Sequence, residues 1–134
     1  MKPNVYKLTY FNDILTLKIL ENKFDDITSQ SLINGIDNFH RSCEKNNKKF
    51  YSLVDITDCS LLNVPNYIYY APTITQYLNS ELYFLDKYLR GTLYIINNGT
   101  VKTILNKILS SHNGSTPKNF ILKDEEIDFS FTEK

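Results

Sequence analysis

The strongest constraint on the fold is an alternation of two hydrophobic patterns along the chain. Residues 50–56 and 92–96 are nearly continuous apolar runs, which predict strands buried on both faces of a sheet. Apolar residues at spacings of three and four follow each run and predict amphipathic helices. Because strands and helices alternate and crossovers between parallel strands are right-handed, the chain is expected to form an α/β domain with helices packed against the sheet.

Two further β-rich runs, residues 5–11 and 14–20, open the chain and are joined by Asn12 and Asp13. Both turn residues tolerate the left-handed backbone of a tight hairpin, so an antiparallel pair is predicted. A last short strand is expected at residues 119–122. The chain is expected to form a single domain over residues 1–134. Its sheet is expected to be mixed and to contain four or five strands.

The helix boundaries are predicted from capping signals. The N-cap candidates of the first helix are Asp25, Asp26 and Thr28. The basic run at residues 45–49 is expected to end this helix. A long second helix is expected after Pro65, with an uncertain first turn because of Pro72, and with Gly91 as its C-terminal stop. A third helix is expected to begin near residue 101, and a final helical turn is expected to start at residues 124–126 and to carry Ile127 and Phe129.

Composition excludes several classes of function. The 134 residues are 42% hydrophobic and carry equal numbers of basic and acidic side chains, which argues against nucleic acid as a main partner. No apolar run approaches the roughly 18 residues of a membrane-spanning helix, and no signal peptide is expected. Cys43 and Cys59 lack metal-site spacing, so reduced thiols in a cytoplasmic protein are predicted, with a disulfide or metal pair as the alternative.

Motifs for catalysis are weak. Asp55 and Asp58 would serve as acid, base or magnesium ligands only if a third carboxylate joined them, and otherwise they would bond nearby backbone. His40 and His112 lie in no recognisable serine or cysteine constellation. The chain is therefore expected not to be an enzyme and to carry no cofactor.

Several segments in order match a known arrangement. They are VDITDCSLLN (54–63), the helix of residues 72–90, LYIINNGTVKTILNKIL (93–109), TPKNFIL (116–122) and KDEEIDF (123–129). With the opening hairpin, this order resembles the STAS domain, the fold of sporulation anti-sigma factor antagonists and of sulfate-transporter tails. The second half is most similar to a bacterial branch of uncertain role. The resemblance implies a regulatory domain that docks onto other proteins.

One departure from the family pattern bears on regulation. In switching STAS proteins, a serine in an Asp-Ser-Ser-Gly-like turn is phosphorylated at the start of the second helix. The matching positions here are Asn63, Val64, Pro65 and Asn66, and none carries a hydroxyl group. A standard phosphorylation switch is therefore not expected, whereas docking through the same surface remains expected.

The first functional hypothesis is a non-catalytic module that binds another protein or itself. Tyrosine is favoured at interfaces because it combines a large apolar body with a polar tip. The long helix carries too many tyrosines for one buried stripe, although codon bias is an alternative reason for their number. The expected partner-binding residues are Asp58, Ser60, Asn63, Asn66, Tyr69 and Tyr70.

The second hypothesis is a small-ligand domain for a nucleotide or a lipid. Asn97, Asn98, Gly99 and Thr100 open a helix, so their backbone N–H groups would hold an anion, or would simply be capped. A lipid would occupy a pocket beside the long helix. That possibility comes from the likeness of this STAS branch to lipid-carrier domains, which is analogy at the level of the fold.

Overall fold

The computed structural model describes residues 4–20, 22–110 and 112–133. The elements follow the chain as β1 (Tyr6–Phe11), β2 (Ile14–Ile19), α1 (Asp26–Asn46), β3 (Phe50–Asp55), the 3₁₀ turn η1 (Leu61–Asn63), α2 (Val64–Ser80), α3 (Leu82–Tyr88), β4 (Leu89–Ile96), α4 (Gly99–Leu109), β5 (Lys118–Leu122) and the 3₁₀ turn η2 (Ser130–Thr132). The five strands form one sheet in the order β1-β2-β3-β4-β5. Strand β1 runs antiparallel to β2, and the other neighbours are parallel, so the predicted α/β class with a mixed sheet is confirmed.

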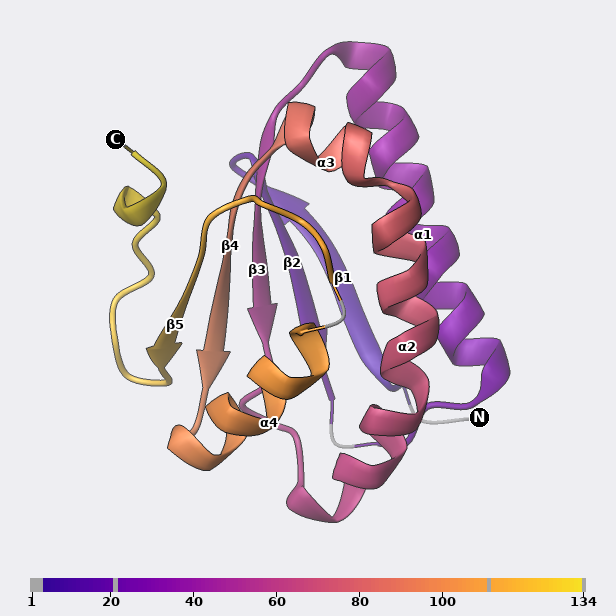
Figure 1. Ribbon diagram of the computed structural model, residues 1–134, viewed down its shortest axis with the longest axis vertical. Helices are drawn as coiled ribbons and strands as arrows, with labels where there is room; N and C mark the ends of the chain where they lie inside the picture. Colours follow the sequence, from indigo (N-terminus) through magenta and orange to yellow (C-terminus); the bar gives the residue numbers. More distant parts are fainter. Residues whose placement is uncertain (1–3, 21, 111, 134) are drawn as a thin grey trace.

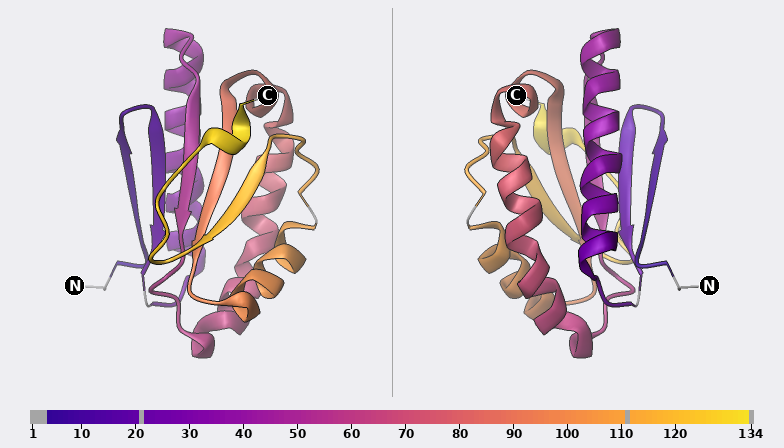
Figure 2. Two further views of the ribbon diagram at one scale, coloured as in Figure 1. Left: turned by 90° about the vertical axis from the view of Figure 1, so that its left-hand side faces the viewer. Right: turned by 90° about the vertical axis from the view of Figure 1, so that its right-hand side faces the viewer.

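The helices lie on one face of the sheet, and the C-terminal segment crosses the opposite face (Figures 1 and 2). This layering follows from the topology, because successive right-handed crossovers in one direction along a sheet place their helices on the same side. Behind the sheet, Phe129 and Phe131 pack against a small cluster of buried strand residues. The cluster consists of Leu53, Leu93, Ile95 and Ile121.

The opening hairpin forms as predicted. Asn12 and Asp13 have φ angles of 51° and 64°, in the left-handed region that such a tight turn requires. Helix α1 then begins with a reciprocal capping box. The Thr28 amide donates to Asp25 Oδ1 at 2.7 Å, and the Asp25 amide donates to Thr28 Oγ1 at 2.8 Å. Asp25 is therefore the N-cap among the three candidates.

A polar cluster around the buried His40 joins α1 to the end of α2. His40 is 2% exposed, and its Nδ1 lies 3.0 Å from Glu81 Oε1 and 3.1 Å from the Tyr77 hydroxyl. Tyr77 donates to Asp37 Oδ1 at 2.8 Å, and Arg41 also bonds Glu81. Burial lowers the pKa of His40, so the ring is neutral near pH 7 and donates its Nδ1 proton to the carboxylate. The histidine is therefore a residue that packs α1 against the end of α2.

The predicted long helix after Pro65 differs from the structure at both ends. Helix α2 begins at Val64 and continues through Pro72 to Ser80. The chain leaves the helix at Glu81, forms the short α3, and enters β4 at Leu89, so the expected helix through residue 90 is wrong. Leu89 pairs with Phe50 on β3. The apolar spacing of Leu85 and Leu89 fits a helix equally well, and only the pairing with β3 decides between the two.

Gly91 is not the helix stop that the sequence suggests, because it lies within β4 and has no positive φ angle. A Cβ atom built at this position would lie 2.3 Å from Cγ2 of Thr132 in the C-terminal segment. The glycine therefore permits close approach of that segment to the sheet.

The expected final helical turn, starting at residues 124–126 and carrying Ile127 and Phe129, is also wrong. Residues 123–125 form a turn in which the Leu122 amide donates to Glu125 Oε1 at 2.9 Å. The helical turn lies later in the chain, at Ser130–Thr132. Just before it, the Phe129 ring packs against the Tyr51 ring, and the two ring centroids are 4.7 Å apart.

Candidate functional site

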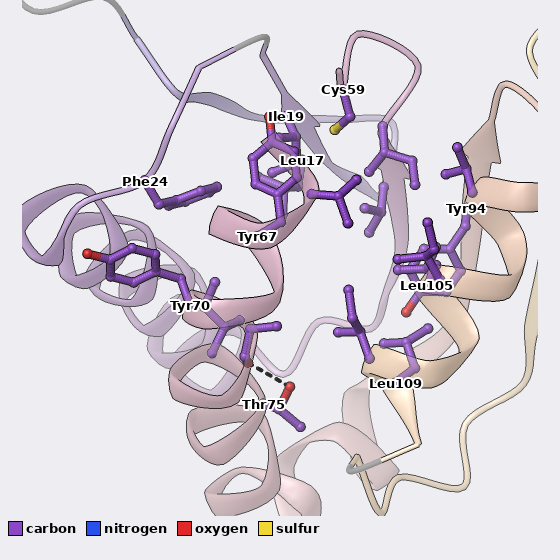
Figure 3. A pocket seen from close by; sticks show the side chains of 18 of the residues that line it. Leu17, Ile19, Phe24, Cys59, Tyr67, Tyr70, Thr75, Tyr94, Leu105 and Leu109 are labelled. Atoms are coloured by element: carbon purple, nitrogen blue, oxygen red, sulfur yellow. Dashed lines mark hydrogen bonds between the residues drawn. The ribbon is translucent and has the colours of Figure 1, made fainter. Parts of the chain in front are cut away.

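A cavity of about 230 Å³ lies between the sheet, α2 and α4, toward the carboxyl ends of the parallel strands (Figure 3). We call it the apolar cavity. Open α/β sheets commonly place ligands near this edge. Its lining residues are Leu17, Ile19, Phe24, Leu32, Val54, Ile56, Cys59, Ser60, Leu61, Val64, Tyr67, Tyr70, Ala71, Ile74, Thr75, Leu78, Tyr94, Val101, Ile104, Leu105, Ile108 and Leu109.

The floor of the apolar cavity is built by the register of three parallel strands. Leu17 on β2 pairs with Val54 on β3, and Val54 pairs with Tyr94 on β4. Neighbours in one row of a sheet point to the same face, so these three side chains all face the helices. Figure 3 shows Tyr94 reaching from its strand toward α4.

The roof consists of two amphipathic helices that do not close onto the sheet. Helix α2 buries only Thr75 fully, and the described part of α4 buries no side chain fully, although its apolar stripe is clear. Leu78 on α2 and Leu105 on α4 are each half-buried and line the cavity. In a filled core such side chains would be enclosed by neighbours, so the two stripes leave space for an apolar occupant.

Polar groups within the apolar cavity are few. Thr75 Oγ1 is already occupied, because it donates to the Ala71 carbonyl oxygen at 2.8 Å. The Tyr67 hydroxyl donates to the backbone of Asn22 at 3.1 Å. Burial raises the pKa of Tyr94 to about 12 and that of the Cys59 thiol to about 11, so both are neutral at physiological pH. No charged side chain lines this cavity among the described residues.

The six residues predicted to bind a partner lie together beside this cavity, and four of them already have a partner within the chain. Asp58 pairs with Lys18 at 3.3 Å, and the Ser60 hydroxyl caps η1 by accepting from the Leu62 amide at 3.2 Å. Asn66 bonds the backbone of Phe24, and the Tyr70 hydroxyl donates to Asp26 at 3.2 Å. Asn63 makes no side-chain cap bond and is half-buried, while Tyr69 is 73% exposed.

Exposed apolar side chains around the start of α2 were not predicted from the sequence. Leu62 is 87% exposed, and Leu61 and Ile68 are exposed beside it. Together with Tyr69 these residues form what we call the apolar rim. The sequence does carry a signal for such an apolar surface, because no charged residue occurs from Cys59 through Ser80.

The predicted anion site at the start of α4 is capped by its own side chains. Asn98 Oδ1 accepts from the Val101 amide at 3.1 Å, and Asn97 donates to the Thr57 carbonyl oxygen at 2.6 Å. Gly99 and Thr100 are exposed, and none of these four predicted residues lines the apolar cavity. The residues that do line it in α4 and β4, Tyr94 above all, were missed as site residues.

Carboxylates do not gather around a metal position. Asp55 Oδ1 accepts from the amide of Thr57 at 2.9 Å and from its hydroxyl at 2.7 Å, which is the local backbone role considered as the alternative. Within residues 4–20, 22–110 and 112–133, no three histidine, cysteine or acidic side chains come together as a metal site. Cys43 and Cys59 are both free thiols.

In the part of the chain that the structure describes, no helix combines the length and apolar character needed to cross a bilayer. A scan against protein-family models, a search of curated proteins and a search of solved structures each returned no match.

Proposed function

We propose that this protein is a non-catalytic binding domain whose apolar cavity holds a small ligand with a hydrocarbon chain. The observation that supports this most directly is the composition of the cavity lining, in which apolar side chains from three strands and from the helices α1, α2 and α4 surround about 230 Å³. Burial of apolar ligand surface contributes about 25 cal/mol per Å², so such a space favours hydrocarbon over water.

Of the two ligands considered from the sequence, a lipid fits better than a nucleotide. A nucleotide requires donors for its phosphates and polar groups for its base, whereas the apolar cavity offers the Tyr94 hydroxyl, the Ser60 hydroxyl that caps η1, and a few other groups already bonded. The residues Asn97–Thr100, which would hold phosphate, lie outside the lining. The resemblance to STAS domains stays a prediction, and the order of elements supports it.

The test is a calorimetric titration with decan-1-ol, which carries a hydrocarbon chain and no charge. Ala71 is a small lining residue on α2, so Ala71→Trp would fill the space without removing a polar contact. Gln76 on the same helix is exposed and lies outside the lining, so Gln76→Trp is the matched control. We expect saturable binding by the wild-type protein and by Gln76→Trp, and none by Ala71→Trp. Equal binding by all three proteins would contradict this function.

A second candidate function is the interaction module first expected from the sequence. The apolar rim favours it, because an uncharged, exposed apolar surface is typical of the centre of a protein interface. Replacing Leu62 and Tyr69 by serine should reduce association with a second copy or another protein, as measured by sedimentation over a concentration series. If the wild-type protein is monomeric at every concentration, self-association through this rim is ruled out.

A further inference from the structure

A second cavity of about 220 Å³ adjoins the apolar cavity, toward the amino ends of the parallel strands. It is bounded by the sheet, the helices α1 to α3, the end of α4 and the loop of residues 112–116. The two cavities share six lining residues, which are Leu17, Val54, Ile74, Leu78, Tyr94 and Leu109. A chain-like ligand lying under α2 would therefore extend from one cavity into the other.

The strand register places one row of polar side chains in the floor of the adjoining cavity, between the apolar Phe50–Leu89 pair and the row of Val54 and Tyr94. Ser52 on β3 pairs with Thr92 on β4, and Thr92 pairs with Lys118 on β5. All three line the adjoining cavity, and they form one row facing the helices. Two residues further along the same strands, this row is followed by the one that contains Val54 and Tyr94.

The polar groups of this row have capacity to bind a ligand. Among the described residues, the Ser52 and Thr92 hydroxyls take part in no side-chain hydrogen bond, and Lys118 forms no ion pair. A hydroxyl group both donates and accepts, and an ammonium group donates up to three hydrogen bonds. A half-buried hydroxyl beside an apolar space lacks hydrogen bonds to water, so a ligand that supplies acceptor atoms stabilises it.

The charge in the adjoining cavity is positive. Among the described residues that line it, only Lys118 is charged near neutral pH, and Lys118 is exposed to solvent. His112 lines it too, but burial and the nearby Lys118 lower its pKa, so it is neutral. The loop is held in place because His112 Nδ1 and the Asn113 amide both bond Asn79 Oδ1 at 2.9 Å.

We propose that the ligand is a single-chain amphiphile with an anionic oxygen head group, a carboxylate or a phosphate. The head group binds Ser52, Thr92 and Lys118, and the hydrocarbon chain runs beneath α2 into the apolar cavity. This inference rests on the proposed function, because it requires that the apolar cavity bind hydrocarbon.

The test compares three probes of equal chain length at pH 8: decan-1-ol, decanoate and decyl phosphate. The variant is Lys118→Gln, and the control is Lys123→Gln, which removes an exposed lysine beyond the other end of β5 that lines neither cavity. Because the Lys118 ammonium group donates charge-assisted hydrogen bonds to an anion, we expect the anion to bind the wild-type protein at least about tenfold more tightly than the alcohol. Lys118→Gln should remove that advantage and leave the affinity for decan-1-ol unchanged, whereas Lys123→Gln should change neither.

The outcomes separate this inference from the proposed function. If decan-1-ol binds as tightly as both anions, or if Lys118→Gln weakens the alcohol and the anions equally, the head-group site is overturned while the hydrocarbon site stands. If none of the probes binds, both are overturned. A preference for only decanoate or only decyl phosphate identifies which head group the site accepts.

Discussion

Asn66 on α2 and Phe24 in the loop before α1 are joined by two hydrogen bonds. The Phe24 amide donates to Asn66 Oδ1 at 2.7 Å, and Asn66 Nδ2 donates to the Phe24 carbonyl oxygen at 2.9 Å. Phe24 lines the apolar cavity, so this amide clamp fixes one wall of the site. Asn66 is one of the residues expected to bind a partner, and within the chain its side chain holds two segments together.

The first prediction concerns this clamp. Asn66→Ala would leave two backbone groups of Phe24 without a partner, so the free energy of unfolding should fall by about 1–3 kcal/mol. The control is Asn63→Ala three residues earlier, where the side chain makes no cap bond, and it should have little effect. Urea unfolding measures both variants, and equal stability of the two would refute the clamp.

The second prediction concerns pH. Burial holds the pKa of His40 below 6.5 in the folded protein, so as the pH falls the unfolded chain takes up the proton first. Stability contributed by the neutral ring is therefore present above pH 6.5 and is lost progressively below it. Glu81, Asp37 and Arg41 face the ring, and the two carboxylates oppose this shift without cancelling it.

The pH prediction is checked by urea unfolding between pH 5 and pH 7.5. His112 shifts in the same direction, so the comparison is between wild type and His40→Gln, which should have a shallower slope of stability against pH. A nuclear magnetic resonance titration of the His40 ring in the wild-type protein should give a pKa below 6.5. A ring that titrates above that value would show that Glu81 outweighs burial.

The third prediction concerns the C-terminal segment. Gly91→Ala would place a methyl group against Thr132 Cγ2, and overpacking of this kind costs about 1–3 kcal/mol. Thr132→Ser removes that methyl group while keeping the hydroxyl that donates to the Phe129 carbonyl oxygen at 2.7 Å. The double variant should recover most of the loss in melting temperature. If it is no more stable than Gly91→Ala alone, the segment does not pack there in solution.

Much of the fold was predictable because its signals are local. The hairpin turn at Asn12 and Asp13, the cap at Asp25 and the stripe of α4 each depend on neighbours within a few residues, and all are present in the structure. The entry into β4 depends on pairing between Leu89 and β3, which the spacing of apolar residues does not encode.

The candidate site was harder to predict for a related reason. Leu78 shows the same helical spacing whether it packs on the sheet or borders an empty space, so its position alone does not reveal a cavity. Tyr94 belongs to a run expected to be buried, and only the register with Val54 places it on the cavity floor. The missing charges between Cys59 and Ser80 were visible in the sequence and would have indicated the apolar rim.

The most direct test of the central claim is an isotope-filtered NOE experiment on ¹³C-labelled protein with unlabelled decan-1-ol. The binding account predicts contacts between the alkyl chain and the methyl groups of Leu17 and Val54 and the ring of Tyr94, which together form the floor of the cavity. Contacts confined to Leu62 and Tyr69 would place the chain on the outer surface, and an absence of contacts at saturating decan-1-ol would mean that the cavity does not take up hydrocarbon. Either result would contradict the account.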